Sequence, residues 1–437
     1  GASRAAANGL KTLLFEEKTL GGACIRDGLL AEPAILDAVR AADTARNGAV
    51  CGFVSEGARL DFGVFAELRE AALKALQDEI VVSFVGNGVE AVNERVVIKG
   101  RFGRSFEVEA AGTVCRAERL LIATGSEDFV PRIEGLETAL GTGFALLPSD
   151  LPALAEPPER LVVIGSGPAA LEAAFFFNAA GSRVTVVELA QEICGALDAD
   201  AGRILRESLA ARGIEFLTGS MPTAFEGGGV RVRSASGVTF VPADKAVVSM
   251  GKKPCAPGFG LEKIGVAVQH GAVVTDAQLR TNKPGVWAVG DVNGKLPSAQ
   301  TAFREAVCAV NDMLGARDSV RYETIPQIVR TVPEAAGVGE TELTARVKGL
   351  AYEVSQVPVC RSKASAARNG NEGLCKLIIE KGTGRLLGAH LVGRYASEEI
   401  LAAAFMVGSA WPAETLRRLA FPHMTEGEAI RDALSQI

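Results

Sequence analysis

Short apolar stretches separated by glycine and polar residues recur along the chain, and one region shows this pattern most clearly. Residues 161–164 are four large apolar residues in a row, which is typical of a fully buried strand. A glycine-rich turn follows, and then an Ala- and Phe-rich stretch that Gly181 brings to an end. A second run of β-branched residues leads to Glu188. We therefore predict a strand–turn–helix–strand unit over residues 160–188.

The start of the chain has the pattern of the second half of such a unit. Residues 1–9 form an Ala-rich helical stretch, and residues 11–16 form a strand that ends in Glu16. The spacing from Gly9 to Glu16 equals that from Gly181 to Glu188. A first strand and its glycine turn are missing from this pattern, so we expect the natural chain to have residues before Gly1.

Two further apolar strands are predicted at residues 120–125 and 286–292. From about residue 326 the character of the chain changes to that of an α+β domain. Strand-like stretches there cover residues 376–379 and 386–392, and an amphipathic helix begins at Glu398, before the end segment 421–437.

Composition excludes several classes of protein. The chain has 437 residues, 48% of them apolar, which suggests about two to four domains. Its 46 basic and 52 acidic side chains give a net charge of −6, which argues against a nucleic-acid-binding surface. No apolar run approaches the ~18 residues of a membrane helix, so we expect no membrane partner. The eight cysteines form no CxxC pair, and none of the three histidines lies near a cysteine pair. We therefore expect a reducing, cytoplasmic compartment and no metal site.

The turn at residues 165–170 has the chemistry of a dinucleotide fingerprint. Gly165 allows the tight turn, Gly167 lets the backbone approach a pyrophosphate, and Ala170 provides the small residue that packs the helix on the strand. The helix N-terminus offers unpaired N–H groups to phosphate. The alternative is a plain βαβ unit with a glycine turn, but the surrounding strand, helix and terminal acid favour a nucleotide.

Seven motifs, in order along nearly the whole chain, resemble those of the FAD- and pyridine-nucleotide-dependent disulfide oxidoreductases, and within that family the dihydrolipoyl dehydrogenases most closely. The resemblance implies an α/β fold with two Rossmann-like dinucleotide-binding domains, for FAD and NAD, and a C-terminal α+β dimerisation domain. We expect the FAD-binding domain at residues 1–147 and the NAD-binding domain at residues 148–270. The remainder of the FAD and central domain is expected at residues 271–323, and the dimerisation domain at residues 324–437. The motifs are TLGGAC (19–24), LLIATGS (120–126), VVIGSGPAALE (162–172), SMGKKP (249–254), LRTNKPGVWAVGDV (279–292), IPQIVRTVPEAAGVGETE (325–342) and FPHMTEGEAIRDA (421–433).

Family roles then fall on matching positions. Glu16 resembles the acid that binds the adenosine ribose of FAD, and Asp291 the acid that binds the ribityl chain. Glu188 is expected to accept hydrogen bonds from the ribose hydroxyls of NAD and to repel the 2′-phosphate of NADP. The alternative interpretation is that each of these acids lies in solvent at the end of a strand and binds no ligand. The other residues to which the resemblance gives a cofactor-binding role are Thr124, Gly125, Gly165, Gly167, Ala170, Glu172, Gly251, Gly290 and Ala302.

His423 and Glu428 resemble the family's C-terminal acid/base pair. In the family this histidine is held by the glutamate, reaches the partner subunit's active site and exchanges a proton with a thiol. An imidazole exchanges a proton near neutral pH, and a carboxylate fixes its tautomer, which suits that role. The resemblance therefore implies a homodimer.

The redox loop departs from the family pattern, which has two cysteines five residues apart and then a lysine. Cys24 matches the outer, interchange cysteine, but without a gap the second cysteine falls on Leu29 and the lysine on Pro33. If the six residues C-I-P-S-K-A are missing between Gly28 and Leu29, the following residues return to the family spacing. We expect this second alignment to describe the natural chain.

Three functions remain open at this point. The first is a homodimeric FAD enzyme that moves electrons between a lipoamide-like dithiol/disulfide and NAD(H), either alone or within a 2-oxo acid dehydrogenase complex. The second, with Leu29 taken as real, is a soluble transhydrogenase or quinone reductase. The third is a flavin-free, non-enzymatic scaffold. Changes at residues 168–169 and 298–300, which flank the flavin in the family, leave lipoamide specificity open.

Overall fold

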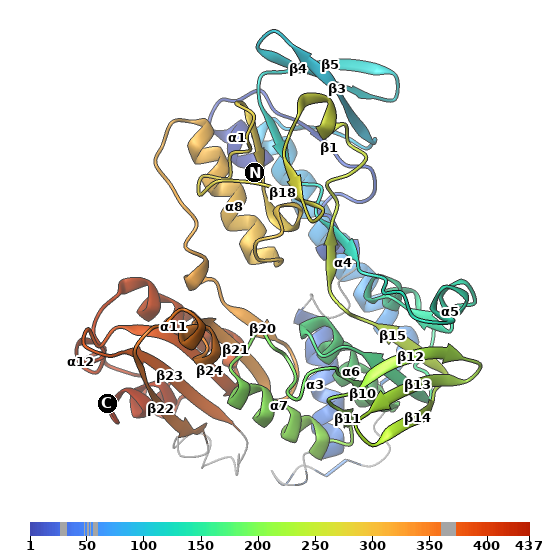
Figure 1. Ribbon diagram of the computed structural model, residues 1–437, viewed down its shortest axis with the longest axis vertical. Coiled ribbons are helices and arrows are strands. Elements are labelled where there is room, and N and C mark those ends of the chain that lie inside the picture. The colour runs from blue at the N-terminus through green and yellow to red at the C-terminus, as the bar shows by residue number, and fades with distance from the viewer. Residues whose placement is uncertain (27–32, 48, 50–51, 53, 56–59, 360–372) are drawn as a thin grey trace. The chain divides into compact units, whose positions relative to one another are not determined.

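The computed structural model describes residues 1–26, 33–47, 49, 52, 54–55, 60–359 and 373–437 (Figure 1). For residues 24, 26, 33–35 and 47 it describes the backbone alone. The chain forms two compact units, each built from three separate segments. Unit 1 comprises Gly1–Gly28, Glu70–Phe129 and Gly251–Tyr322, and unit 2 comprises Leu29–Arg69, Val130–Met250 and Glu323–Ile437.

Unit 2 contains a five-stranded parallel sheet in the order β11-β10-β9-β15-β8. Its central strands are continuous runs of buried apolar residues, because helices and neighbouring elements cover the sheet on both faces. The strands are β8 Ala145–Leu146, β9 Arg160–Ile164, β10 Arg183–Val187, β11 Glu215–Leu217 and β15 Lys245–Val248.

The helix α6 (Pro168–Ala180) connects β9 to β10 and is apolar around most of its circumference. Proline at its first position suits the fixed φ of a helix start, and Gly181 ends it in a left-handed conformation. The ring of Phe176 packs against Phe62 and Phe65, which belong to the first of the three segments of unit 2. A helix that is hydrophobic all round belongs in a core, and this one lies there.

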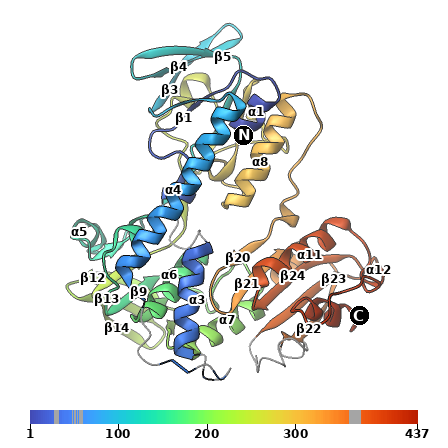
Figure 2. The same cartoon turned by 180° about the vertical axis from the view of Figure 1, so that it is seen from behind.

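The C-terminal sheet, also in unit 2, is antiparallel throughout in the order β20-β21-β24-β23-β22. Helix α11 (Ala396–Ser409) lies across β21 and β24, and α13 (Glu428–Leu434) packs on β22 and β23 (Figure 2). These elements share one hydrophobic core. The strands are β20 Gln327–Val329, β21 Glu334–Gly339, β22 Tyr352–Pro358, β23 Leu374–Glu380 and β24 Leu386–Gly393.

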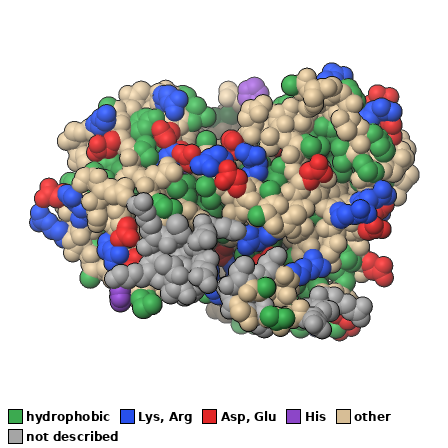
Figure 3. Space-filling model, turned by 90° about the horizontal axis from the view of Figure 1, so that it is seen from below, with side chains coloured by type: hydrophobic (Ala, Val, Ile, Leu, Met, Phe, Trp, Pro, Cys, Tyr) green, Lys and Arg blue, Asp and Glu red, His purple; other side chains and the backbone are tan. Residues whose placement is uncertain are grey.

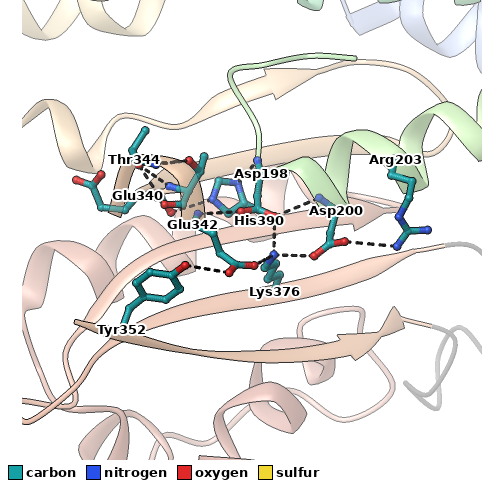
Figure 4. Close-up of polar contacts among 10 residues, drawn as sticks. Asp198, Asp200, Arg203, Glu340, Glu342, Thr344, Tyr352, Lys376 and His390 are labelled. Carbon is teal, nitrogen blue, oxygen red and sulfur yellow. Dashed lines mark hydrogen bonds and ion pairs between the residues drawn. The ribbon is translucent and has the colours of Figure 1, made fainter. Parts of the chain in front are cut away.

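A buried lysine joins the parallel-sheet part of unit 2 to the C-terminal sheet. Lys376 on β23 is 1% exposed, and its ammonium group donates to Asp198 at 2.6 Å, to Asp200 at 2.7 Å and to Glu342 (Figure 4). Beside it, His390 accepts the N–H of Asp198 at Nδ1 (3.3 Å) and contacts the carbonyl of Glu340 at Nε2 (3.0 Å). Since a carbonyl only accepts, Nε2 carries the proton and the ring is neutral, in line with burial, which lowers the pKa of His390.

The remaining elements of unit 2 surround these two sheets. They include the three-stranded antiparallel sheet β12-β13-β14 and the helices between the strands. Their bounds are α3 Pro33–Asn47, α5 Leu136–Gly141, η2 Pro148–Ala153, α7 Ala199–Ala211, β12 Met221–Glu226, β13 Gly229–Ser234, β14 Gly237–Pro242, α9 Glu342–Val347 and α12 Ala413–Leu416.

Unit 1 combines short parallel and antiparallel pairs around its own cores. β1 (Leu13–Phe15) pairs in parallel with β2 (Glu90–Val92), and β6 (Leu120–Ile122) pairs in parallel with β19 (Val286–Ala288). Helix α4 (Phe62–Asn87) is divided between the units, with residues 62–69 in unit 2 and residues 70–87 in unit 1. Its other elements are α1 Ala2–Ala7, α2 Ala23–Arg26, β3 Val96–Phe102, β4 Ser105–Ala110, β5 Thr113–Ala117, β7 Ser126–Asp128, β16 Lys252–Pro254, η3 Leu261–Ile264, β17 Val268–Gln269, β18 Ala272–Val273, η4 Gly290–Asn293 and α8 Ala299–Met313, with η5 Tyr322–Thr324 at its boundary.

The strand–turn–helix–strand unit and the N-terminal helix and strand are confirmed, and the C-terminal region is α+β. The strands predicted at residues 120–125 and 286–292 are present but shorter. They end at Ile122 and Ala288, and Gly290–Asn293 forms a 3-10 helix because Gly290 takes a positive φ there. The helix expected from Glu398 begins two residues earlier, at Ala396. The predicted domain boundaries at residues 147, 270 and 323 stay predictions.

Two observations concern the surface. No helix in the described part of the chain is long and apolar enough to cross a membrane. On the face drawn in Figure 3, lysine and arginine side chains are interspersed with aspartate and glutamate, and the described residues there form no continuous basic patch.

Candidate functional site

The turn between β9 and α6 has the geometry of a dinucleotide-binding turn. Gly165 has a φ of +103°, and a Cβ there would lie 2.3 Å from the carbonyl oxygen of Ser249, so only glycine fits. A Cβ on Gly167 would meet no heavy atom within 4 Å, which leaves space above the first turn of the helix. Ala170 is fully buried against the core. The turn thus has the tight backbone, the open space and the small buried residue that the sequence predicted for it.

Glu188 lies directly after β10, beside this turn. Its Oε2 accepts a hydrogen bond from the hydroxyl of Ser166 at 2.6 Å, and its Oε1 accepts the N–H of Ala190 at 2.8 Å. Ser166 belongs to the turn itself, so the acid and the turn are held together. This arrangement fits the ribose of a pyridine nucleotide, which is the role predicted for Glu188.

In unit 1, a second polar cluster surrounds Asp291 at the end of β19. Ser126 donates its hydroxyl to Asp291 at 2.5 Å, and Thr124 donates to the carbonyl of Cys255 at 2.6 Å. The Thr124–Gly125 turn and Asp291 therefore lie close together, as the resemblance to FAD-binding motifs implies. Glu16, at the end of β1, accepts the N–H of Lys18 at 2.9 Å.

The conformation of the loop at Asp291 depends on Glu305, which the sequence pattern did not reveal. Glu305 is fully buried on α8 and accepts hydrogen bonds from the Gly290 N–H (2.6 Å), the Asn293 amide (2.7 Å) and the Tyr322 hydroxyl (2.6 Å). The pKa of Tyr322 is raised, first by burial and then by this carboxylate. A Cβ on Gly290 would lie 3.2 Å from that of Ala302, so the two predicted residues are in close contact. In the sequence, Glu305 could have been recognised only as an acid that falls within the apolar face of an amphipathic helix.

Glu172 is half-buried on α6, and its carboxylate accepts the N–H of Arg330 at 2.9 Å, with the guanidinium Nη1 3.9 Å away. Burial raises the pKa of Glu172 to about 7, against the opposing effect of Arg330. Arg330 was not identified from the sequence. Gly251 lies in the loop after β15 and has a φ of +107°. Its carbonyl accepts the N–H of Phe129 at 3.0 Å.

The C-terminal acid/base pair has the predicted contact. The Nδ1 of His423 lies 3.1 Å from Oε1 of Glu428, and Arg431 donates to the same oxygen at 2.9 Å. Glu428 is fully buried, whereas the side chain of His423 is 65% exposed. Burial works against ionisation of Glu428, but Arg431 and His423 outweigh it and lower its pKa. Because an ionised carboxylate only accepts, the Nδ1 atom of His423 carries a proton in this contact.

The redox loop is the part of the predicted site that the structure leaves open. Cys24 is in α2, but its side chain lies outside the described atoms, and so do Gly28 and Leu29. Pro33 begins α3, with its side chain likewise outside the described atoms. Among the other cysteines, Cys194, Cys308 and Cys375 are buried, in agreement with packing roles, and Cys115 and Cys255 are partly buried.

One group of carboxylates in the described residues has the spacing of a metal site: Asp198, Asp200 and Glu342. The ammonium group of Lys376 already lies among them and bonds to all three, as Figure 4 shows. Positive charge from the chain itself therefore occupies the centre of this cluster, and Arg203 lies 3.6 Å from Asp200 at its edge.

Each unit thus has a turn that contains glycine beside a carboxylate at a strand end, and sequence comparison identifies the family of the chain. A family model described as "Pyridine nucleotide-disulphide oxidoreductase" matches residues 1–306, and the model of that family's dimerisation domain matches residues 325–434. The chain therefore belongs to the FAD-dependent pyridine nucleotide-disulfide oxidoreductases, and within them it is similar to dihydrolipoyl dehydrogenases. Its cofactors are accordingly FAD and NAD, as the sequence resemblance implied.

Individual relatives cover almost the whole chain. It is 32% identical to the mitochondrial dihydrolipoyl dehydrogenase of Pisum sativum over 451 aligned positions, which cover 99% of this chain and 87% of the relative. It is 31% identical to dihydrolipoyl dehydrogenase 3 of Pseudomonas putida, with 100% and 95% covered. Among solved structures, LpdA of Mycobacterium tuberculosis has a TM-score of 0.88 at 24% identity (100% and 96% covered), and the Cu(II) complex of the HOCl-induced flavoprotein disulfide reductase RclA of Escherichia coli has 0.84 at 24% (99% and 95% covered). These two likenesses support the fold.

Proposed function

We propose that this enzyme transfers electrons between NAD(H) and the dithiol/disulfide pair of a lipoamide-like substrate. The observation that carries the proposal is the His423–Glu428 pair, an exposed imidazole held at 3.1 Å by a buried carboxylate. Such a pair serves to remove a proton from a thiol and return it. Transhydrogenation or quinone reduction would give it no thiol to act on.

When bound, FAD supplies the two-electron relay between the pyridine nucleotide and the disulfide. The chain's own groups bind and move protons. The turn at Gly165 and Gly167 binds the pyrophosphate of NAD, and Glu188 accepts hydrogen bonds from its adenosine ribose. Cys24 attacks the substrate disulfide as the thiolate, and His423 takes and returns the proton.

The preference for NAD over NADP follows from charge at Glu188. A 2′-phosphate placed against this carboxylate would meet like charge, whereas ribose hydroxyls can donate to the acceptor sites that Ser166 and Ala190 leave unused. We therefore propose NAD(H) as the ligand of the turn at residues 165–170.

A complete dithiol relay requires a second cysteine near Cys24. The alignment with the Pisum sativum relative has 451 positions, more than the 437 residues of this chain, so that relative has internal residues without a counterpart here. This difference supports the expectation that residues C-I-P-S-K-A belong between Gly28 and Leu29. We further propose a homodimer in the cytoplasm, consistent with the dimerisation domain, that works free or within a 2-oxo acid dehydrogenase complex.

The test begins with the intact mass of the denatured natural polypeptide and a peptide map across residues 26–40. A mass above 45.5 kDa, with a peptide that contains a second cysteine and a lysine, is expected. The holoenzyme is then assayed for NADH-linked reduction of lipoamide, with His423→Gln as the paired variant. A peptide in which Gly28 is joined directly to Leu29, together with flavin-dependent quinone reduction, would replace this proposal with a non-disulfide acceptor.

A further inference from the structure

Ser166 lies between the two glycines of the nucleotide-binding turn and is 4% exposed. Its hydroxyl donates to Oε2 of Glu188 at 2.6 Å, a distance typical of a hydrogen bond to an ionised carboxylate. The same hydroxyl oxygen accepts the N–H of Cys194 at 3.2 Å. Because a backbone N–H can only donate, the proton of the Ser166 hydroxyl points away from Cys194 and toward Glu188. The direction of this hydrogen bond is therefore fixed by the fold.

Glu188 is held in place at its backbone and at both carboxylate oxygens. Its N–H donates to the carbonyl of Leu217 at 3.0 Å, and its carbonyl accepts the N–H of Ser220 at 2.9 Å. The N–H of Ala190, two positions further along the same loop, donates to Oε1 at 2.8 Å. Of the two donors to the carboxylate, only Ser166 belongs to the turn, 22 positions earlier in the chain. The hydroxyl of Ser166 therefore fixes the direction in which the carboxylate points from the strand end.

This direction decides which nucleotide the turn accepts. A carboxylate that is already fixed can accept hydrogen bonds from ribose hydroxyls without first losing rotamer freedom, which is worth about 3–10-fold in affinity. The same fixed carboxylate cannot move aside for a 2′-phosphate, which would meet like charge. A glutamate released from Ser166 would bind the ribose less well and would be free to turn away from a phosphate.

We propose that Ser166 is a positioning residue that sets the preference of this turn for NAD over NADP, by holding the carboxylate of Glu188 toward the turn before the nucleotide binds. The inference rests on the proposed function in taking NAD(H) as the ligand of the turn. Its variant Ser166→Ala should fold, because the N–H of Cys194 keeps the carbonyl of Ser166 as an acceptor at 3.1 Å.

The test is isothermal titration of the holoenzyme with three ligands that carry no nicotinamide and therefore do not react with a flavin. They are ADP-ribose, its analogue without the two hydroxyls of the adenosine ribose, and its analogue with a 2′-phosphate there. The wild type should prefer ADP-ribose to the dideoxy analogue by about 10–100-fold, because the hydroxyls donate to a charged acceptor. Ser166→Ala should bind ADP-ribose about 3–10-fold more weakly. Its affinity for the dideoxy analogue should be unchanged, and its affinity for the 2′-phosphate analogue unchanged or higher.

Two further variants make the result specific to the contact with Glu188. In a Glu188→Ala background, Ser166→Ala should have no further effect on the affinity for ADP-ribose. Ser182→Ala is the matched control and should leave all three affinities unchanged. Ser182 is 3% exposed and donates its hydroxyl to the carbonyl of Pro158 at 2.5 Å, at the opposite end of β10 from Glu188.

The possible failures can be told apart. Equal weakening of all three ligands in Ser166→Ala would show that the hydroxyl merely supports the turn, and unchanged affinity for ADP-ribose would show that it does not position Glu188. Either result would overturn the inference and leave the proposed function standing. A wild type that does not bind ADP-ribose would overturn both. A lack of lipoamide reduction with the expected pattern of affinities would count against the proposed function alone.

Discussion

Replacing Lys376 by methionine should destabilise unit 2 more than any exposed ion pair could. The side chain is 1% exposed, and Asp198, one of its three carboxylate partners, is 2% exposed. Burial opposes the ionisation of Asp198, but hydrogen bonds from Lys376 and from the N–H of Glu342 hold its pKa below the usual value. Methionine has a similar length but no charge, so Asp198, Asp200 and Glu342 would lie within 4.8 Å of one another with no cation at their centre. Only Arg203, 3.6 Å from Asp200, would remain at the edge of the cluster. Breaking a buried ion pair from one side costs about 3–5 kcal/mol.

The assay is urea unfolding of the holoenzyme, followed by circular dichroism and tryptophan fluorescence. At pH 7 we expect Lys376→Met to lower the free energy of unfolding by about 3–5 kcal/mol. Lys348→Met is the matched control, since Lys348 is 58% exposed and pairs with Glu340 alone among the described residues. Such exposed pairs contribute about 0–1 kcal/mol.

The pH dependence gives a second criterion with a definite sign. In the wild type, Asp198 stabilises the fold above its unfolded pKa, and this contribution is lost as the pH falls through its lowered folded pKa. Without Lys376, burial is the largest remaining effect and raises the pKa of Asp198. At pH 5 Asp198 is then more often protonated in the variant, which reduces the cost of burying it. The difference in the free energy of unfolding between variant and wild type therefore becomes smaller. Asp198→Asn combined with Lys376→Met should recover part of the loss. A loss below about 1 kcal/mol, or one that grows as the pH falls, would refute this account of the cluster.

Three other predictions concern the nucleotide turn and the acid/base pair. Gly165→Ala should abolish NADH binding, measured by NADH fluorescence, because a Cβ would lie 2.3 Å from the carbonyl oxygen of Ser249; unchanged affinity would contradict the turn geometry. Glu188→Ala should raise the KM for NADH and leave the KM for NADPH unchanged or lower; a parallel rise of both KM values would argue against a ribose contact. His423→Gln should lower disulfide reduction about 10²–10⁴-fold while NADH-to-thio-NAD transhydrogenation persists, and equal loss of both rates would remove the histidine from thiol chemistry.

The sequence predicted those features that depend on neighbouring residues. The unit around residues 160–188 was predictable because its strand, turn and helix signals are contiguous, and the His423–Glu428 contact because five residues separate the pair. Positions of Gly165, Gly167 and Glu188 followed from the same local pattern.

Contacts between distant segments could not be predicted in this way. Arg330 lies 158 residues from Glu172, and no periodicity connects them. Lys376 was included in a strand, where a lone lysine is ordinarily solvent-facing, yet partners from α7 and α9 enclose it. Helix α4 lacks a clear apolar face, so its 26 residues carried no helical signature.

The ion pair between Lys376 and Asp198 also has a consequence for how the protein is synthesised. The two residues are 178 positions apart. At about 5–20 residues per second, the lysine codon is translated roughly 9–36 s after the aspartate codon. During that interval Asp198, Asp200 and then Glu342 are synthesised, but the ammonium group that bonds to all three is absent. The last of the three segments of unit 2 is still incomplete. A chaperone that holds the nascent chain through this interval would protect the apolar helix α6 until the ribosome has completed unit 2.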